Sequence, residues 1–275
     1  MTGLWNDLLD CLDLAPAGAN AHEGSSQQLE YRRLFGGQLL AQFACAAQLA
    51  APGKALKSLH TQFLREGRTG EPVVYRSEVA QQGRTFAAVR LTAHQERGVV
   101  AVANASLHTW EEGSDRQTTE PVPPLPGPEH AVELGLLPWE SRAAADLDTP
   151  KSEPAEYALW TRIPPASHTF APALLAYATD LTAIGTALRP VEGVTQADAG
   201  LAFTSAVTSH TVWLHRPFTT GDWLLLRQHS PLAAHGRSFA RGDVLTRDGS
   251  LLASYAQEAL LRFPPREASS VPQDQ

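Results

Sequence analysis

One stretch late in the chain organises the sequence: Ser209-His210-Thr211-Val212-Trp213-Leu214-His215-Arg216-Pro217-Phe218. It is rich in β-branched and aromatic residues, which predicts a strand. The first half holds an echo of it, His60-Thr61-Gln62-Phe63-Leu64, in which the His-Thr pair occurs 150 residues earlier. An echo at this separation indicates a chain built from two related halves.

The similarity between the halves extends beyond this pair. Gly70-Glu71 corresponds to Gly221-Asp222, and Gly83-Arg84-Thr85-Phe86-Ala87 corresponds to Gly236-Arg237-Ser238-Phe239-Ala240. The offset between the copies changes only at turns, where insertions cost little. The repeat therefore predicts a pseudo-symmetric pair of modules whose sheets join edge to edge.

Each half begins with a stretch of helical character that has no charged face. Residues 36–50 carry no charge, and residues 172–188 carry only Asp180. Helices of this kind are normally buried on all sides. A membrane span is the competing interpretation of residues 36–50, but three glutamines and the Pro52-Gly53 stop disfavour it.

Turn residues and apolar runs outline the remaining elements. A short helix is expected over residues 4–12 and a loop over 15–28. The expected strands are 59–64, 73–79, 85–92 and 99–107 in the first half, and 202–208, 211–214, 223–228, 238–246 and 251–261 in the second. The resulting class is α+β, with residues 1–110 and 166–265 as the two modules, 111–165 as a Pro-rich linker and crossing loop, and 266–275 as a disordered tail.

Composition narrows the class of protein. The 275 residues are 43% hydrophobic, enough for a substantial core, and the net charge of −7 disfavours nucleic acid as a partner. Cys11 and Cys45 both lie in apolar helical patterns and show neither disulfide nor metal spacing. The acidic N-terminus, residues 1–14, lacks the features of a signal peptide. A cytoplasmic protein that does not act at membranes is expected.

One motif invites a different interpretation. Gly236-Arg237-Ser238-Phe239-Ala240 is one residue from the G-x-S-x-G nucleophile elbow, which requires a strand-turn-helix context. Its counterpart in the first half lies in a predicted internal strand. A serine hydrolase fold is therefore not expected.

The chain resembles the acyl-CoA thioesterase II (TesB-like) family, whose members have a double hotdog fold. The matching stretches span nearly the whole chain in order: Phe35-Gly36-Gly37-Gln38, Leu59-His60-Thr61-Gln62-Phe63-Leu64-Arg65, Tyr177-Ala178-Thr179-Asp180, Trp213-Leu214-His215-Arg216-Pro217-Phe218, Arg241-Gly242 and Ala256-Gln257-Glu258. The resemblance implies two central helices, each wrapped by a curved antiparallel sheet. It also implies hydrolysis of acyl-CoA by an activated water, without metal or other cofactor, as part of lipid metabolism.

The family site combines an Asp, a Thr or Ser, and a Gln. The Gln falls on Gln257, the Asp falls on Ser209, and the hydroxyl residue falls on Pro231 beside Ser230. Ser209 is a poor general base because a hydroxyl does not accept a proton near neutral pH, and on a regular strand His210 points to the opposite face. The alternative for Ser209 is a structural strand hydroxyl, and for Gln257 an outward polar position.

Asp180 is a possible replacement base, since other hotdog thioesterases carry a carboxylate on the central helix and burial raises the pKa of an acid. Its alternative is a structural role, bonded to Thr179 or Thr182. His60 aligns with a family histidine but is a lone strand residue. Gly36 and Gly37 could offer backbone N–H groups to an oxyanion, or simply allow close helix packing.

Two alternatives to an active thioesterase remain open. The first is an acyl-CoA-binding homologue that is weakened or inactive because it lost the usual Asp. The second is a hotdog hydratase, which ranks last because its D-x-N-P-x-H motif is absent. Exposed sheet edges are compatible with a homo-oligomer in each case.

Overall fold

The computed structural model describes residues 2–29 and 33–264. The first module contains two helices and six strands. In chain order these are α1 (Thr2–Leu12), β1 (Ala15–Pro16), β2 (Ala21–Gly24), α2 (Gly36–Ala50), β3 (Ala55–Phe63), β4 (Val73–Gln82), β5 (Phe86–Gln95) and β6 (Gly98–His108). The expected helices and the meander after α2 are confirmed.

The second half repeats this plan after the linker. Its elements are η1 (Pro128–His130), β7 (Glu140–Arg142), β8 (Glu156–Arg162), α3 (Ala171–Asp180), α4 (Ala183–Leu188), η2 (Gln196–Asp198), β9 (Thr204–Leu214), β10 (Leu224–Ala234), β11 (Arg237–Thr246) and β12 (Leu251–Arg262). The predicted tail, 266–275, lies outside the described residues.

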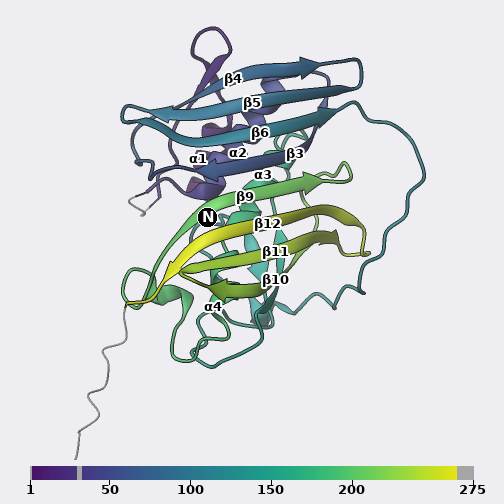
Figure 1. Cartoon of the computed structure of the whole chain (residues 1–275). Coiled ribbons are helices and arrows are strands. Elements are labelled where there is room, and N and C mark those ends of the chain that lie inside the picture. The colour runs from purple at the N-terminus through teal and green to yellow at the C-terminus, as the bar shows by residue number, and fades with distance from the viewer. Residues whose placement is uncertain (1, 30–32, 265–275) are drawn as a thin grey trace, which may run out of the picture.

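The twelve strands of the described residues form one antiparallel sheet, and its central strands, β3 to β6 and β9 to β12, are labelled in Figure 1. The order is β1-β2-β4-β5-β6-β3-β9-β12-β11-β10-β8-β7, so β3 and β9 join the two modules edge to edge. The predicted echo at His60 and the stretch at His210 therefore lie on the two strands of the joint. Each of these strands uses one edge for its own module and one for the other.

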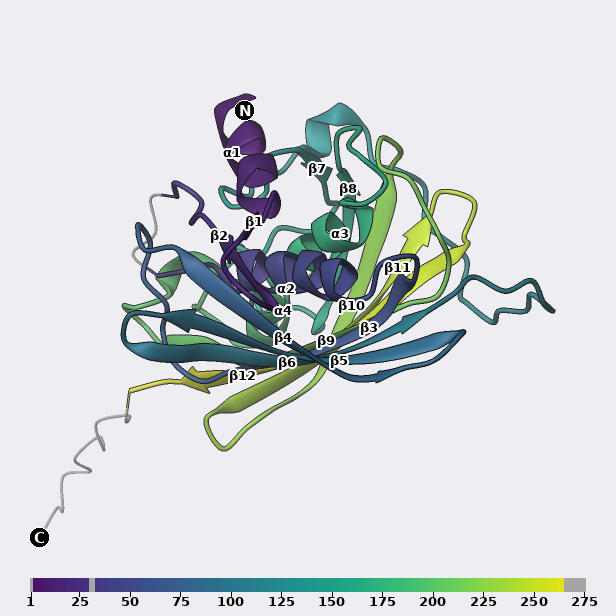
Figure 2. The same ribbon diagram turned by 90° about the horizontal axis from the view of Figure 1, so that it is seen from above.

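The two central helices lie together on the same side of this curved sheet (Figure 2). α2 is buried along almost its whole length, as its uncharged sequence predicts. The helices are antiparallel: Gly37 at the start of α2 lies against the Tyr177 carbonyl near the end of α3, while Gln48 Nε2 donates to the Thr169 carbonyl at the other end at 3.0 Å. The end of α3 is thereby brought to the start of α2.

The second helical stretch differs from the prediction of one continuous helix. Residues 171–188 form α3 and α4, separated by Leu181 and Thr182. This stretch is also long and apolar enough for a membrane span, yet 83% of it is buried within the protein. Its apolar character is thus explained by packing inside the sheet.

Three further expectations were wrong. Residues 15–28 were expected to be a loop but contribute β1 and β2, and the expected linker and crossing loop, 111–165, contains β7 and β8. β1 and β7 are the outermost strands of the sheet, and β1, β2 and β7 have only two to four residues each, too few to show an apolar periodicity. The two strands expected over 202–208 and 211–214 are one strand, β9, which begins at Thr204, because a register shift beside Glu258 accommodates an extra residue without a break.

The repeat alignment is off by one residue at the central joint. His60 pairs with Thr211, and Thr61 pairs with His210. Paired residues share a face of the sheet and neighbours along a strand do not, so His60 and His210 point to opposite faces. His60 is exposed and His210 is fully buried. The matching His-Thr pairs are therefore not structural equivalents.

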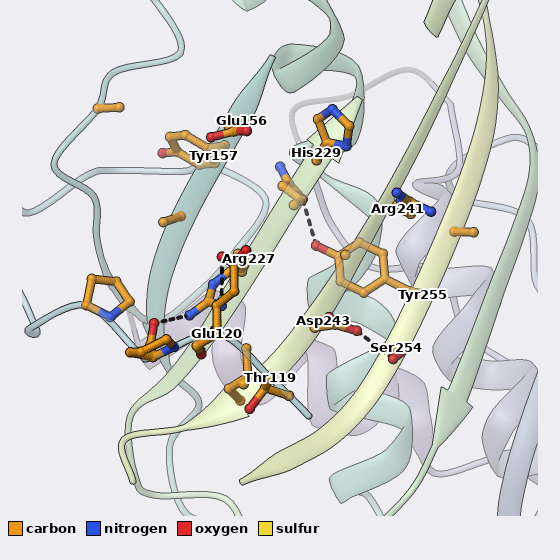
Figure 3. Close-up of a pocket in the computed structure, with 18 of the residues that line it drawn as sticks. Thr119, Glu120, Glu156, Tyr157, Arg227, His229, Arg241, Asp243, Ser254 and Tyr255 are labelled. Atoms are coloured by element: carbon orange, nitrogen blue, oxygen red, sulfur yellow. Dashed lines mark hydrogen bonds and ion pairs between the residues drawn. The ribbon is translucent and has the colours of Figure 1, made fainter. Parts of the chain in front are cut away.

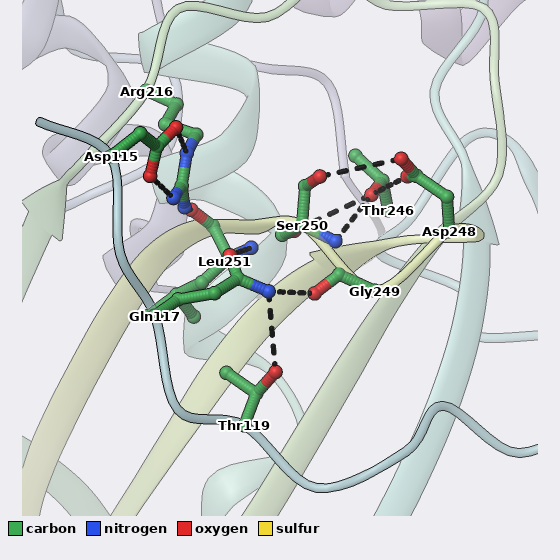
Figure 4. A network of polar contacts seen from close by, with 9 residues as sticks. All are labelled: Asp115, Gln117, Thr119, Arg216, Thr246, Asp248, Gly249, Ser250 and Leu251. Atoms are coloured by element: carbon green, nitrogen blue, oxygen red, sulfur yellow. Dashed lines mark hydrogen bonds and ion pairs between the residues drawn. The ribbon is translucent and has the colours of Figure 1, made fainter.

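The linker is fastened to the second module (Figure 4). Asp115 forms an ion pair with Arg216, which also donates to the Leu251 carbonyl at 2.6 Å. Gln117 donates to the Gly249 carbonyl at 2.7 Å and accepts from the Leu251 N–H at 3.0 Å. The segment that connects the modules is thus held at Asp115 and Gln117 beside the start of β12.

Candidate active site

The last residue of α3, Asp180, is the centre of a buried polar cluster. Its carboxylate lies against the first turn of α2, where a Cβ on Gly36 would come within 2.8 Å of Asp180 Oδ2. A Cβ on Gly37 would come within 2.7 Å of the Tyr177 carbonyl oxygen. Real side chains do not approach so closely, so only glycine at both positions lets the two helices meet and delivers the carboxylate.

Two influences on the pKa of Asp180 oppose each other. Burial raises it, because water no longer solvates the charge, and the Gly37 backbone N–H lowers it. Phe35, which precedes α2, has no side-chain acceptor for the free N–H groups of the first turn, so a carboxylate is favourable there. Burial dominates, and the pKa rises to about 7. The group can therefore accept and return a proton near neutral pH.

A second part of the cluster comes from the sheet. Gln257 on β12 and His210 on β9 are paired across the strands and share the inward face. The Gln257 amide nitrogen points at Asp180, since the opposite orientation would set the amide oxygen against two acceptor oxygens. It lies 3.1 Å from Asp180 Oδ1, 3.3 Å from the Asp180 carbonyl and 2.8 Å from His210 Nδ1.

This orientation fixes the tautomer of His210. Because Nδ1 accepts from Gln257, Nε2 carries the proton and donates to Thr179 Oγ1 at 3.0 Å. Thr179 Oγ1 in turn donates to the Ala176 carbonyl at 2.9 Å. Burial lowers the pKa of His210 to about 4, so the ring is neutral. At 3.9 Å from Asp180 Oδ1, it positions Gln257 rather than pairing with the carboxylate.

The structure brings four of the predicted site residues together: Asp180, Gln257, Gly36 and Gly37. The Gly37 N–H faces the Asp180 carboxylate rather than an open oxyanion position. The predicted partners of a structural Asp180 are engaged elsewhere, Thr179 with His210 and Thr182 with Gln228 Nε2 at 2.8 Å.

The other three predicted residues lie apart from this cluster. Ser209 pairs with Glu258 and Gln62, on the face of β9 opposite His210. His60 is exposed, with Nε2 3.1 Å from Ser58 Oγ and its ring edge-on to Trp213.

Ser230 is held by the second module's own sheet. Its hydroxyl donates to the Phe239 carbonyl at 2.8 Å, which joins β10 to β11 at a register shift. The Ser230 hydroxyl, expected to stand in for the hydroxyl residue of the family site, is therefore bonded to the backbone of the neighbouring strand.

His210 and Thr179 belong to the cluster but were not predicted as site residues. A lone histidine beside Ser209 gives no sign of its partner until the register of β9 and β12 is known. The sequence did contain one signal: Thr179 is next to Asp180, the only charge of a buried helix. Because buried hydroxyls are nearly always hydrogen-bonded, Thr179 could have been expected to have a polar partner near Asp180.

A separate cleft of about 1000 Å³ lies between linker residues 118–123 and strands β10 to β12 (Figure 3). Arg227 donates from it to the Pro121 carbonyl at 2.8 Å, and Tyr255 donates to Gln228 Oε1 at 2.7 Å. None of the predicted site residues is among the described residues that line it. The cleft is thus distinct from the Asp180 cluster.

Comparison with known proteins identifies the fold and the family. Residues 27–108 match the acyl-CoA thioesterase N-terminal domain, and residues 110–261 match the acyl-CoA thioesterase C-terminal domain. An acyl-CoA thioesterase 2 from Haemophilus influenzae is 32% identical, over 96% of this chain and 99% of that protein.

Solved structures agree. An acyl-CoA thioesterase II from Mycobacterium marinum is 28% identical with a TM-score of 0.77, covering 95% of this chain and 99% of that one. A tesB protein from Mycobacterium avium subsp. paratuberculosis is 29% identical with a TM-score of 0.78, covering 95% and 100%. The fold is a double hotdog, and the chain belongs to the TesB-like acyl-CoA thioesterase II family of thioester hydrolases.

Proposed function

We propose that this chain hydrolyses acyl-CoA thioesters with Asp180 as the general base. Membership of a family of thioester hydrolases supports the reaction. The observation that carries the assignment of the base is a buried carboxylate with a pKa of about 7, in contact with a helix N-terminus and the Gln257 amide. A base works best when its pKa lies near the working pH.

In the proposed reaction, Asp180 takes a proton from a water molecule as the water oxygen attacks the thioester carbonyl carbon. The carbonyl oxygen becomes negative in the tetrahedral intermediate. Collapse of this intermediate breaks the carbon–sulfur bond, and the proton held by Asp180 passes to the departing CoA sulfur. The products are the free acid and CoA, with the carboxylate regenerated.

The start of α2 is the proposed position of the thioester carbonyl. Gly36 is half-buried, so it is the more accessible end of the cluster. As the first residue of α2 it carries an N–H without an intrahelical acceptor, at the positive end of the helix dipole. A donor of this kind stabilises an oxyanion by about 3–4 kcal/mol in enzymes that use one. Gln257, held by His210, would orient the water.

Release of free thiol from a panel of short-, medium- and long-chain acyl-CoA substrates tests this proposal. Asp180→Asn should lower kcat/KM by about 10²–10⁴-fold, because the amide cannot accept the proton. Asp222→Asn, at an exposed aspartate, is the matched control. Undiminished hydrolysis by Asp180→Asn would remove Asp180 from the mechanism. No thiol release from any acyl-CoA by the wild type would instead favour the inactive binding homologue.

A cytoplasmic location and a role in lipid metabolism belong to the same proposal. Both cysteines are buried and unbonded, and burial raises the pKa of the Cys11 thiol to about 11 and that of Cys45 to about 12. Unreactive thiols of this kind suit a reducing compartment. Fractionation of the native host, followed by immunodetection of the chain, would test the location.

A further inference from the structure

A large groove lies at the end of the paired helices opposite the Asp180 cluster. It encloses about 1300 Å³. Both modules contribute apolar residues to its wall. They include Cys45, Leu49 and Leu56 from the first module, and Pro172, Leu214 and Phe218 from the second. Cys45 is eight residues beyond Gly37 on α2, which is about 12 Å along the helix axis. We call this site the helix-end groove.

The groove occupies the place of the Asp180 cluster under the pseudo-symmetry of the two modules. When α2 and α3 are matched from their first residues, Gly36 and Ala171, Pro172 takes the position of Gly37 and Cys45 takes the position of Asp180. Both Pro172 and Cys45 line the groove. The start of α3 thus packs against the later part of α2, as the start of α2 packs against the end of α3 in the Asp180 cluster.

The groove lacks the chemistry of the Asp180 cluster. Pro172 has no backbone N–H, so it cannot act as Gly37 does. Burial raises the pKa of the Cys45 thiol to about 12, so the thiol stays protonated at neutral pH and is neither a base nor a nucleophile. A ligand could bind at this place without being hydrolysed.

The charges at the rim indicate the kind of ligand. Lys54, Lys57 and Arg216 line the groove, whereas Asp13 is the one acidic residue among the described residues of its lining. Arg216 is paired with Asp115, so Lys54 and Lys57 are the cations to test. Lys57 Nζ lies 5.6 Å from the centre of the Phe86 ring. An apolar chain that carries phosphates matches an apolar trough with a cationic rim.

We infer that the helix-end groove is a second, non-catalytic binding site for acyl-CoA. The inference rests on the proposed function for the identity of the ligand. In each module the start of the central helix packs against the other central helix, so the arrangement proposed for the substrate site occurs twice. Occupancy of the groove would place a second acyl chain about two helical turns from the reacting thioester, against the same two helices. The chain would then bind two acyl-CoA molecules and hydrolyse one.

Calorimetric titration with S-decyl-CoA, a thioether that cannot be hydrolysed, tests the stoichiometry. Two molecules should bind per wild-type chain. The double variant Lys54→Glu/Lys57→Glu should weaken one binding event at least about tenfold by charge reversal. The control Arg116→Glu/Lys151→Glu makes the same charge change at exposed linker positions and should retain both events. Titration with decanoate and with CoA alone separates the contributions of chain and head group.

Three results would overturn the inference. One molecule per wild-type chain would mean that the groove is empty of this ligand, and two unweakened events in Lys54→Glu/Lys57→Glu would place the second site elsewhere. Complete loss of thiol release in that variant would make the groove the catalytic site. A failure of the Asp180 mechanism would appear separately, as hydrolysis by Asp180→Asn, and would leave the stoichiometry unchanged.

Discussion

The contact between the start of α2 and the end of α3 makes Gly37→Ala a sharp test of how the site is built. The added Cβ would lie 2.7 Å from the Tyr177 carbonyl oxygen and would also meet the Phe35 ring. The Phe35 side chain can rotate, but the Tyr177 carbonyl is part of the α3 backbone. The helices must therefore move apart, and Asp180 moves with α3.

The expected magnitude follows from two opposing effects. Overpacking of a well-packed interior costs about 1–3 kcal/mol, and the upper part of this range applies where the obstacle is backbone. Alanine improves helix propensity by about 1 kcal/mol over glycine. The net loss in free energy of unfolding is then about 1–2 kcal/mol, equivalent to about 2–4 °C in Tm for each kcal/mol.

Urea unfolding and thiol release together provide the assay. Gly3→Ala in α1 is the matched control, because an added Cβ there meets nothing within 4 Å and the same substitution should be neutral or stabilising. Gly37→Ala should unfold at lower urea concentration and hydrolyse acyl-CoA more slowly. If it matched Gly3→Ala in both measurements, the close approach of the two helices would have no bearing on stability or on the site.

Three further predictions follow from the cluster. Because the pKa of Asp180 is about 7 in the folded protein and 3.8 in the unfolded chain, the stability it contributes is greatest below pH 4 and is lost by pH 7, by on the order of 4 kcal/mol in all. Roughly 3 kcal/mol of this loss lies between pH 5 and pH 8, so urea unfolding at these two pH values should show it in wild type and not in Asp180→Asn; an equal loss in both would assign it to another group. Ser209→Ala should release thiol at the wild-type rate while Gln257→Ala loses at least about tenfold, and the reverse order would restore Ser209 to the site. Thr179→Val leaves His210 Nε2 unpartnered and should lower the free energy of unfolding by about 1–3 kcal/mol, whereas an unchanged urea midpoint would contradict a stabilising hydrogen bond between Thr179 and His210.

Much of the architecture was predictable because it rests on local patterns. The absence of charge in residues 36–50 predicted the buried helix α2, and turn residues with apolar runs between them predicted most of the strands. These signals depend only on residues a few positions apart, so they survive without tertiary information. The short strands β1, β2 and β7 were missed because two to four residues hold too little periodicity.

The Asp180 cluster was predictable only in part. The helical position of Asp180, together with the family resemblance, marked it as a candidate. Ser209 and His60 were predicted with it from matching sequence, which does not show on which face of a strand a side chain lies. A slip of one residue moves every side chain of a strand to the other side of the sheet. The off-by-one match between His60 and His210 is such a slip. Because of it, the exposed His60 was predicted as a site residue and the buried His210 was not.

The sequence by itself thus determined that the chain has two related modules, each with an uncharged central helix, and which family it belongs to, because repeats, composition and motifs are properties of residue order. Only the tertiary structure decided that Asp180 meets Gly37, which lies 143 positions earlier in the chain. It also decided that Gln257 and His210 face Asp180 from the sheet. The reason is physical. A carboxylate acquires a pKa of about 7 from the water it loses and the donors it gains, and both depend on which elements pack around it.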